Sequence, residues 1–221
     1  TVFSINHSLS DKLLQSLDFQ LTKAQNRSIE EINKDIASSN PMLRLLQGDV
    51  GSGKTIVAVF ALLQAVENNF QTAVMAPTEI LARQHLQSFA IYLNPLGIKV
   101  AFLSGSQNVQ ERREQLSLIE KGEAQVIIGT HALFQEKVAF NNLALVIIDE
   151  QHKFGVHQRL SLSQKAKITP HQLVMTATPI PRSLTMSAYA DLDTSIIDEL
   201  PPGRQAIEPV ALSNTRRDDL I

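Results

Sequence analysis

One eight-residue segment constrains the fold of this chain more than any other. Residues 48–55 read Gly-Asp-Val-Gly-Ser-Gly-Lys-Thr, which fits the pattern G-x-x-x-x-G-K-[ST]. An apolar run at 42–46 precedes the segment and a helix-like run at 56–66 follows it, as the pattern requires. In that context, backbone N–H groups and the amino end of the next helix form a nest for phosphate oxygens. The sequence therefore predicts a phosphate-binding loop at the start of an α/β domain.

The residues of this loop have separate expected roles. Its glycines permit tight backbone turns, because they carry no Cβ. Lys54 is expected to reach the β- and γ-phosphates of a nucleotide, and the Thr55 hydroxyl is expected to hold Mg²⁺. The alternative is a glycine-rich turn that binds nothing. The residues expected to contact the nucleotide are Gly48, Asp49, Val50, Gly51, Ser52, Gly53, Lys54 and Thr55.

The composition excludes several other classes of protein. The chain has 221 residues, 43% apolar and 19% charged, which suits one soluble α/β domain with a large core. No apolar run approaches the roughly 20 residues of a membrane helix, and no signal-peptide pattern opens the chain. The absence of cysteine excludes disulfides and cysteine metal sites, and it fits a cytoplasmic protein. With a net charge of −2, any contact with nucleic acid is expected to be local.

Short apolar runs alternate with amphipathic stretches along most of the chain. We expect strands at 42–46, 73–76, 100–103, 126–128, 145–148, 173–175 and 195–197. We expect helices at 56–67, 79–92, 109–120 and 181–189. This alternation predicts βαβ units on a parallel sheet with helices on both faces, a three-layer α/β fold. The carboxyl ends of the strands then share one edge, where ligands bind in open α/β sheets.

The two ends of the chain depart from this pattern. Residues 1–20 contain a short helix-like piece at 9–17 and are expected to be a lead-in from a preceding region. Thr22 is expected to cap a helix that runs to residue 36. The main domain is predicted at 21–200, and residues 201–221, which begin Pro-Pro-Gly-Arg, are expected to be a linker and the start of another domain. Because the chain begins with Thr1 rather than methionine, we expect it to be a piece of a longer protein.

A second chemical segment ends the apolar run at 145–148. There Asp149 is expected to hold Mg²⁺, and Glu150 to orient and deprotonate an attacking water. Alternation along a strand points the two side chains in different directions, which suits two separate tasks. A water-activating glutamate directly after the metal-binding aspartate favours an ATPase over a nucleotide kinase. Without a phosphate-binding loop in the chain, the same pair would be interpreted as the start of a solvated loop.

A third segment, Met-Thr-Ala-Thr-Pro at 175–179, ends another apolar run. The hydroxyls of Thr176 and Thr178 are expected to bind carboxylates or a γ-phosphate. The alternative is a simple hydrogen-bonded turn at the end of a strand.

Together these segments resemble superfamily 2 helicases and translocases over nearly the whole chain, which implies a RecA-like fold. The segment from Leu21 to Gln25 resembles the adenine-reading Q motif, and the resemblance implies that Gln25 contacts adenine. Residues 76–82, 104–106 and 129–131 resemble motifs Ia, Ib and Ic, which line the nucleic-acid side of the lobe. Such contacts position a strand without reading its sequence. The implied nucleic-acid contacts are Pro77, Thr78, Gly105, Thr130 and His131.

Motif II reads Asp-Glu-Gln-His at 149–152. The resemblance implies that Gln151 and His152 sense the γ-phosphate, and that Thr176 and Thr178 couple this state to the rest of the motor. The long segments 149–159 and 175–182, with the linker at 200–204, resemble the bacterial RecG family. Members of that family are ATP-dependent DNA helicases that regress stalled forks and migrate Holliday junctions in recombination and repair.

The resemblance to the RecG family implies further cofactors and partners. It implies ATP and Mg²⁺, branched or double-stranded DNA, and a monomeric protein. It also implies a second RecA-like lobe and a wedge domain outside this chain. The second lobe normally supplies arginine fingers, so Arg182, Arg204, Arg216 and Arg217 are not expected to act as fingers. The chain alone is therefore expected to hydrolyse ATP poorly.

Four other interpretations are open at this point. Transcription-repair coupling translocases share much of the pattern, but they typically have Glu-Glu-His after the motif II aspartate and lack the Pro-Pro-Gly-Arg linker. DEAD-type RNA helicases usually have Ser-Ala-Thr in motif III and Ala-Asp at the end of motif II. A nucleotide-gated binding module would not need Glu150. A small-molecule kinase would need an acceptor-substrate site, which the sequence does not reveal.

Overall fold

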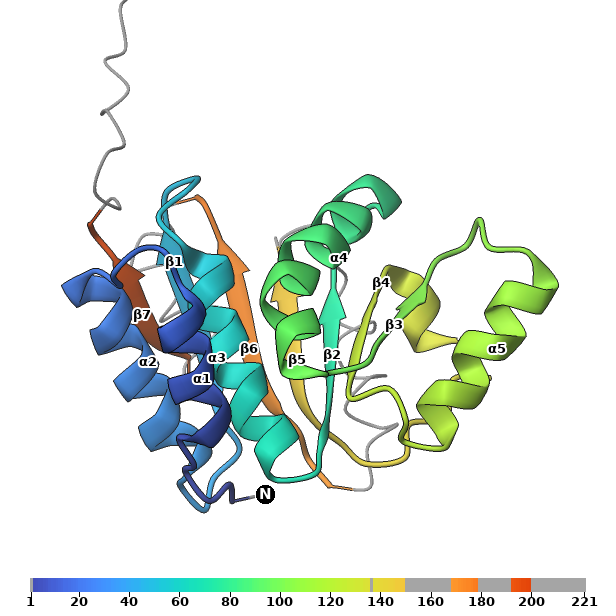
Figure 1. Ribbon diagram of the computed structural model, residues 1–221, viewed down its shortest axis with the longest axis horizontal. Helices are drawn as coiled ribbons and strands as arrows, with labels where there is room; N and C mark the ends of the chain where they lie inside the picture. Colours follow the sequence, from blue (N-terminus) through green and yellow to red (C-terminus); the bar gives the residue numbers. More distant parts are fainter. Residues whose placement is uncertain (1, 136, 150–167, 179–191, 200–221) are drawn as a thin grey trace, which may run out of the picture.

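The computed structural model describes residues 2–135, 137–149, 168–178 and 192–199 (Figure 1). Its strands form one seven-stranded sheet in the order β3-β4-β2-β5-β6-β1-β7, and all neighbouring strands are parallel. The carboxyl ends of the strands therefore share one edge, at the top of Figure 1. The strands are β1 (Leu43–Gly48), β2 (Gln71–Met75), β3 (Val100–Leu103), β4 (Val126–Gly129), β5 (Leu143–Asp149), β6 (His171–Thr176) and β7 (Asp193–Ile197). The parallel α/β prediction is confirmed.

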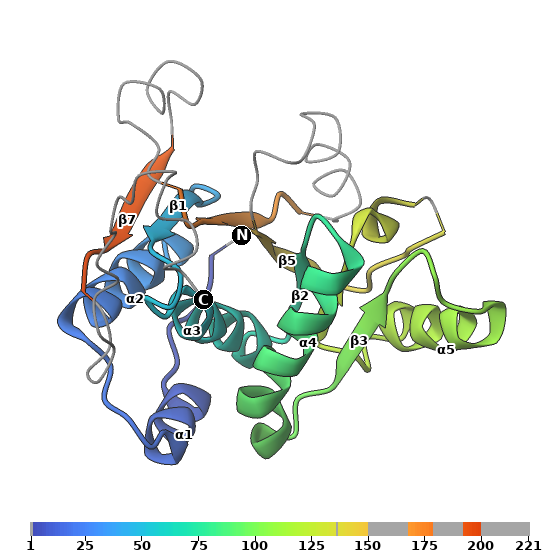
Figure 2. The same ribbon diagram turned by 90° about the horizontal axis from the view of Figure 1, so that it is seen from above.

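Helices cover both faces of this sheet. They are α1 (Ser8–Ser16), α2 (Lys23–Ile36), α3 (Lys54–Glu67), α4 (Glu79–Leu93) and α5 (Val109–Glu120), with 3-10 turns η1 (Asn94–Leu96) and η2 (His131–Phe134). Figure 2 shows α2, α3 and α4 along one side of the sheet. The predicted helix at 181–189 and the predicted linker at 201–221 lie outside the described residues. No described helix has both the length and the apolar character that a membrane crossing needs.

Two apolar clusters follow the alternation of side chains along the strands. Val74 of β2 joins a cluster with α3, whereas its neighbours Ala73 and Met75 join a second cluster with Ile119 of α5 and Leu133 of η2. Since successive strand residues point to opposite faces, the two clusters lie on opposite sides of the sheet. The predicted three-layer arrangement is confirmed.

Helix α3 is the most enclosed helix among the described residues. All ten residues from Ile56 to Ala65 are buried, and the helix contacts α1, α2, α4 and the strands β1, β2 and β5. A helix that is apolar all round is stable only when it is packed on all sides. The helix that follows the phosphate-binding loop is therefore held from several directions.

The amino-terminal segment is packed against the lobe. Phe3 is only 1% exposed and stacks on Phe70 with 5.2 Å between ring centroids. The Asn68 side chain accepts a hydrogen bond from the Ser4 N–H and donates one to the Ser4 carbonyl, both at 2.9 Å. Gln64, one helical turn earlier, pairs in the same way with the backbone of Asn6 at 3.0 and 2.6 Å. These side-chain amides pair with the backbone of the segment much as a neighbouring strand would. The sequence pattern did not indicate this pairing.

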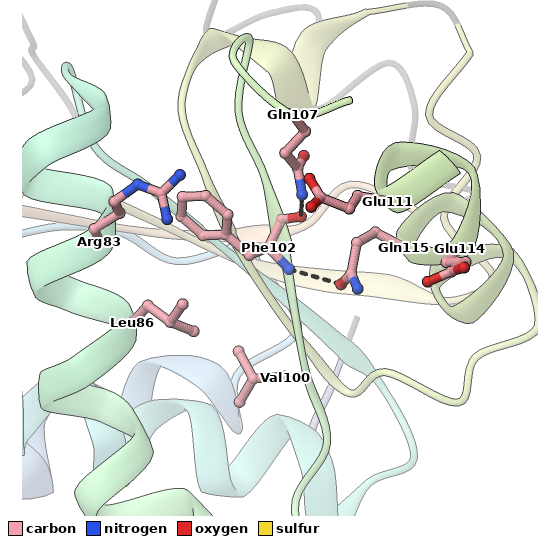
Figure 3. Close-up of a pocket in the computed structure, with 8 residues that line it drawn as sticks. All are labelled: Arg83, Leu86, Val100, Phe102, Gln107, Glu111, Glu114 and Gln115. Carbon is pink, nitrogen blue, oxygen red and sulfur yellow. Dashed lines mark hydrogen bonds between the residues drawn. The ribbon is translucent and has the colours of Figure 1, made fainter. Parts of the chain in front are cut away.

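Strand β3 lies at one edge of the sheet, and side chains cover its outer backbone groups. The Phe102 N–H donates to Gln115 Oε1 at 3.0 Å, and Gln107 Nε2 donates to the Phe102 carbonyl at 3.0 Å (Figure 3). The Arg83 guanidinium stands 5.1 Å from the centroid of the Phe102 ring. Uncovered edge strands invite pairing with other chains, so these amides protect the edge.

Candidate functional site

The loop between β1 and α3 has a backbone shape that requires glycine. Gly51 and Gly53 have φ angles of 80° and 90°, in the left-handed region that L side chains rarely adopt. A Cβ on Gly48 would come within 2.5 Å of Ser52 Oγ, and one on Gly53 would overlap Gln25 Nε2. The glycines of the sequence motif are therefore needed for this particular loop geometry.

The polar groups of the loop fit a phosphate. Lys54 Nζ donates to the carbonyls of Gly48 at 2.6 Å and Asp49 at 3.0 Å, which holds its ammonium against the loop. Ser52 Oγ is buried and has no hydrogen-bond partner among the described residues. A buried hydroxyl of this kind calls for a partner, and a helix amino end beside a lysine attracts an anion. Val50 is 73% exposed, and Thr55 is half-buried beside Lys54, so the loop remains open to solvent.

Gln25, the predicted adenine-reading residue, is buried and engaged on both sides of its amide. Its Oε1 accepts from the Thr22 N–H at 2.9 Å, which completes the predicted N-terminal cap of α2. Its Nε2 donates to the Ser52 carbonyl at 2.8 Å. The side chain thus ties the amino end of α2 to the phosphate-binding loop. Its contact with adenine stays a prediction.

Asp149 and the phosphate-binding loop lie on the same sheet edge. Strand β6 runs between β1 and β5, and the register places Asp149 beside Met175 and Met175 beside Leu46. At about 4.8 Å per strand, Asp149 lies about 10 Å across the sheet from Leu46, two residues before the end of β1. One metal–nucleotide complex spans such a gap. Placement at opposite ends of the sheet would have excluded a shared cation.

The threonines at the end of β6 form a local turn. Thr176 is 2% exposed, and its hydroxyl lies 2.9 Å from that of Thr178 and accepts from the Thr178 N–H at 3.2 Å. The strand-ending turn that the sequence allowed is therefore present, between the ends of β1 and β5. The coupling role of the two threonines stays a prediction. Glu150, Gln151 and His152 lie outside the described residues.

Sequence reasoning missed a partner of Asp149. His85 Nε2, from α4, lies 2.7 Å from Asp149 Oδ2, and the two side chains are only 14% and 13% exposed. His85 stands three residues after the stretch that resembles motif Ia, but nothing in its local pattern points to a residue 64 positions later. Only the tertiary fold brings the two together.

The segments that resemble motifs Ia, Ib and Ic meet at the carboxyl ends of β2, β3 and β4, and we call this region the predicted nucleic-acid edge. The Ala76 N–H donates to the Gly129 carbonyl at 3.0 Å, and the Thr130 N–H donates to the Leu103 carbonyl at 3.2 Å. Ser106 Oγ donates to Glu79 Oε1 at 2.5 Å. The 76–82 segment is thus bonded directly to both other segments, and Thr130 is bonded to Leu103, the residue just before the 104–106 segment. The strands β2, β4 and β3 carry this region, while β5, β6 and β1 carry the candidate nucleotide site.

The predicted nucleic-acid contacts differ in their exposure. Thr78, Gly105 and His131 are exposed, and Pro77 is half-buried. Thr78 also caps α4, because its hydroxyl accepts from the Leu81 N–H at 3.3 Å. Thr130 is only 3% exposed, and its hydroxyl accepts from the Ala132 N–H at 3.5 Å. Its side chain is therefore used inside the loop in this structure.

Glu79 connects two of these segments through its carboxylate. Besides the Ser106 bond, Glu79 Oε1 accepts from Arg83 Nη2 at 2.8 Å on the next turn of α4. The Ser106 hydroxyl, and after it the Arg83 guanidinium, hold the pKa of the Glu79 carboxyl below its usual value. The carboxylate also sits in the first turn of α4, where negative charge stabilises a helix.

A parallel sheet with a phosphate-binding loop, an aspartate one strand beyond β6 and a separate motif-bearing edge defines the ATP-binding lobe of a helicase-type motor. Residues 22–187, more than half of the chain, match the family model described as DEAD/DEAH box helicase. The chain belongs to this family.

Within the family, the chain is similar to the ATP-dependent DNA helicase RecG. It is 57% identical to RecG of Escherichia coli strain K12 over 221 residues, which cover 99% of this chain and 32% of that protein. It is 55% identical to RecG of Haemophilus influenzae over 216 residues, which cover 96% and 31%. The chain thus spans about a third of the length of these curated relatives.

Solved structures agree with this similarity. The structure titled RecG bound to three-way DNA junction superposes with a TM-score of 0.86 at 43% identity, covering 99% of this chain and 29% of that one. The DEAD-box helicase Mss116 superposes with a TM-score of 0.66 at 17% identity, covering 88% of this chain and 44% of that one. The second likeness shows the fold alone.

Proposed function

We propose that this chain is the ATP-binding motor lobe of an ATP-dependent DNA helicase that remodels branched DNA in recombination and repair, regressing forks and migrating Holliday junctions. One observation carries the proposal: the phosphate-binding loop and Asp149 share a sheet edge across β6, and the predicted nucleic-acid edge continues along the same side of the sheet. The similarity to RecG supports the choice of branched DNA as substrate.

The nucleotide lies across the carboxyl ends of β1, β6 and β5 in this proposal. The Thr55 hydroxyl and the Asp149 carboxylate would hold Mg²⁺, which would neutralise charge on the phosphates when bound there. Lys54 leaves the carbonyls of Gly48 and Asp49 and binds phosphate oxygens. The N–H groups at the amino end of α3 complete the phosphate contacts. The loop residues therefore position the triphosphate and stabilise its charge.

Residues beyond the loop have the remaining roles. Glu150 orients the attacking water and accepts its proton. Gln151 and His152 sense the γ-phosphate, and Thr176 and Thr178 pass this state to the rest of the lobe. Gln25 contacts adenine.

The predicted nucleic-acid edge binds the DNA backbone. Pro77, Thr78, Gly105, Thr130 and His131 lie in loops or at helix amino ends, which contact phosphates and do not read bases. With a net charge of −2, this chain makes only part of the DNA contact. A second RecA-like lobe and a wedge domain supply the rest in a monomeric, cytoplasmic protein.

The substitution Lys54→Ala in the complete protein tests this proposal. We expect ATP hydrolysis to fall to background, because the ammonium that binds the phosphates is lost, while affinity for a DNA junction stays within about twofold. ATPase assays with forked DNA, duplex DNA and RNA, together with junction-binding titrations, measure both properties. Lys99→Ala is the matched control, because Lys99 is 65% exposed and paired only with Glu123 among the described residues.

Three outcomes would contradict the proposal. Loss of junction affinity together with hydrolysis in Lys54→Ala would show that the two tasks are not divided as proposed. Equal stimulation of the unaltered protein by RNA and by forked DNA would favour an RNA helicase. Nucleotide binding without turnover in the unaltered protein would identify a nucleotide-gated binding module.

A further inference from the structure

The contact between His85 and Asp149 has no place in the mechanism described so far. A carboxylate oxygen only accepts hydrogen bonds, so the imidazole Nε2–H donates to Asp149 Oδ2 across 2.7 Å. Both side chains are largely shielded from water, at 14% and 13% exposure. The imidazole ring also meets the Phe89 ring edge-on, with 5.9 Å between centroids. These two contacts fix the ring on both sides, and the ring in turn fixes one oxygen of the carboxylate.

We propose that His85 is a positioning residue for the carboxylate of Asp149, and that α4 thereby links the metal-binding aspartate to the predicted nucleic-acid edge. This inference rests on the proposed role of Asp149 toward Mg²⁺. With Oδ2 held by His85, Oδ1 is the oxygen left to face the cation. Hydrogen bonds to a ligating carboxylate orient it, and their loss typically costs about 10- to 100-fold in metal affinity.

Helix α4 is the physical connection between the two regions. Its amino end carries Glu79, which is bonded to Ser106 of the neighbouring loop, and its second turn presents His85 to β5. Six residues along a helix span about 9 Å, so α4 reaches from one region to the other within two turns. Nucleic acid that contacts Thr78 or the Ser106 loop therefore acts on the element that holds the imidazole.

The alternative is that the His85 side chain only fills space between α4 and β5. A purely structural role would change stability without changing how nucleotide binding depends on Mg²⁺. The two possibilities are therefore distinguished by measuring Mg²⁺-dependent nucleotide binding in folded variants that keep or remove the hydrogen-bond donor at position 85.

The test uses His85→Ala, His85→Gln and the control Gln87→Ala in the complete protein. Gln places its amide N–H close to the position of Nε2, while Gln87 is exposed on the same helix. Binding of a fluorescent, non-hydrolysable ATP analogue is titrated at increasing Mg²⁺ and in EDTA, with thermal unfolding measured in parallel. We expect the Mg²⁺ concentration at half-saturation to rise about 10-fold in His85→Ala, with binding in EDTA unchanged. His85→Gln should recover most of this loss, and Gln87→Ala should match the unaltered protein.

A second readout tests the link through α4. We expect forked DNA to stimulate ATP hydrolysis less in His85→Ala than in His85→Gln, with the difference in kcat rather than in KM for ATP. Equal Mg²⁺ dependence in His85→Ala and the unaltered protein overturns the inference, and so does failure of His85→Gln to recover it. If His85→Ala does not fold, His85→Asn, whose amide is too short to reach Oδ2, replaces it in the comparison with His85→Gln.

The two proposals fail in different ways. If the unaltered protein shows no Mg²⁺-dependent nucleotide binding, the proposed function itself fails. If the unaltered protein shows this dependence and the His85 variants retain it, only the positioning role is lost.

Discussion

At the scale of single residues, Gly53 and Gly105 provide a matched pair of substitutions. Gly53→Ala places a Cβ at a φ of 90° and against the Gln25 amide, whereas a Cβ on Gly105 meets no atom within 4 Å. We expect Gly53→Ala to lower the free energy of unfolding by about 1–3 kcal/mol and to abolish nucleotide binding. Gly105→Ala should change stability by less than about 0.5 kcal/mol and weaken DNA binding only. Urea denaturation with nucleotide and DNA titrations measures the difference. Equal stability of the two variants would contradict the left-handed conformation and close contact assigned to Gly53 in the phosphate-binding loop.

Gln25 separates a structural role from the adenine contact. Gln25→Ala removes the bonds to the Thr22 N–H and the Ser52 carbonyl, so we expect a loss of about 1–3 kcal/mol in the free energy of unfolding. If Gln25 also reads adenine, the preference for ATP over GTP should fall. Chemical denaturation and competition between the two nucleotides check the two effects independently. A variant of unchanged stability would show that the tie to the loop contributes nothing.

The residues of the site differ in how far the sequence alone predicts them. The phosphate-binding loop and Asp149 are recognisable because their chemistry is encoded in consecutive residues at the ends of strands. The contacts of Gln25 with Ser52 and of His85 with Asp149 join residues 27 and 64 positions apart, so they depend on tertiary packing. Thr130 resembles a surface motif in sequence, yet its side chain is buried, because burial is decided by the neighbouring strands.

At the scale of elements, the bond between Ser106 and Glu79 joins α4 to the loop after β3. Because the Ser106 hydroxyl is the largest cause of the lowered pKa of Glu79, we expect Ser106→Ala to raise that pKa toward its usual value. The Glu79 contacts stabilise the fold at pH values above the unfolded pKa of this carboxyl, and this contribution is lost as pH falls through the lowered, folded pKa. An NMR titration of the Glu79 carboxyl measures the shift, with Ser117→Ala of α5 as control. An unchanged pKa would mean that the two segments are not joined in solution.

Elements with strong local signals were predicted closely, and those fixed by tertiary contacts were not. The bounds of β3 and α5 match the predictions at 100–103 and 109–120. The apolar run defines β3, and Asn108 caps α5 by accepting from the Glu111 N–H at 2.8 Å. Strand β6 begins at His171, two residues before the predicted start at residue 173, and η2 was not predicted at all. The packing of residues 3–6 on α3 was also missed, because it is made by the Gln64 and Asn68 side chains.

At the scale of the whole molecule, the proposed function makes the candidate site one half of a catalytic centre. Several described arginines are engaged in ion pairs within the lobe: Arg27 with Asp198, Arg44 with Asp35 and Arg83 with Glu79. Arg112 donates to the Ser104 carbonyl and to Gln135 at the other end of the sheet. Each of these four guanidiniums is thus already bonded to groups of the lobe itself. The proposed function therefore leads us to expect that the stabilising charge for the transferring phosphate comes from a second lobe.

This arrangement predicts a large difference between the 221-residue chain alone and the complete protein. We expect the isolated chain to bind nucleotide weakly and to hydrolyse ATP about 10³- to 10⁵-fold more slowly than the complete protein with forked DNA, because an arginine finger accounts for a factor of that size. Thermal unfolding first establishes that the isolated chain is folded, and single-turnover assays with and without forked DNA then measure hydrolysis. Since the proposed DNA contacts on this chain are also partial, DNA should stimulate it little. Turnover by the isolated chain at the rate of the complete protein would show that the charge is supplied from within these residues, and the requirement for a second lobe would then be wrong.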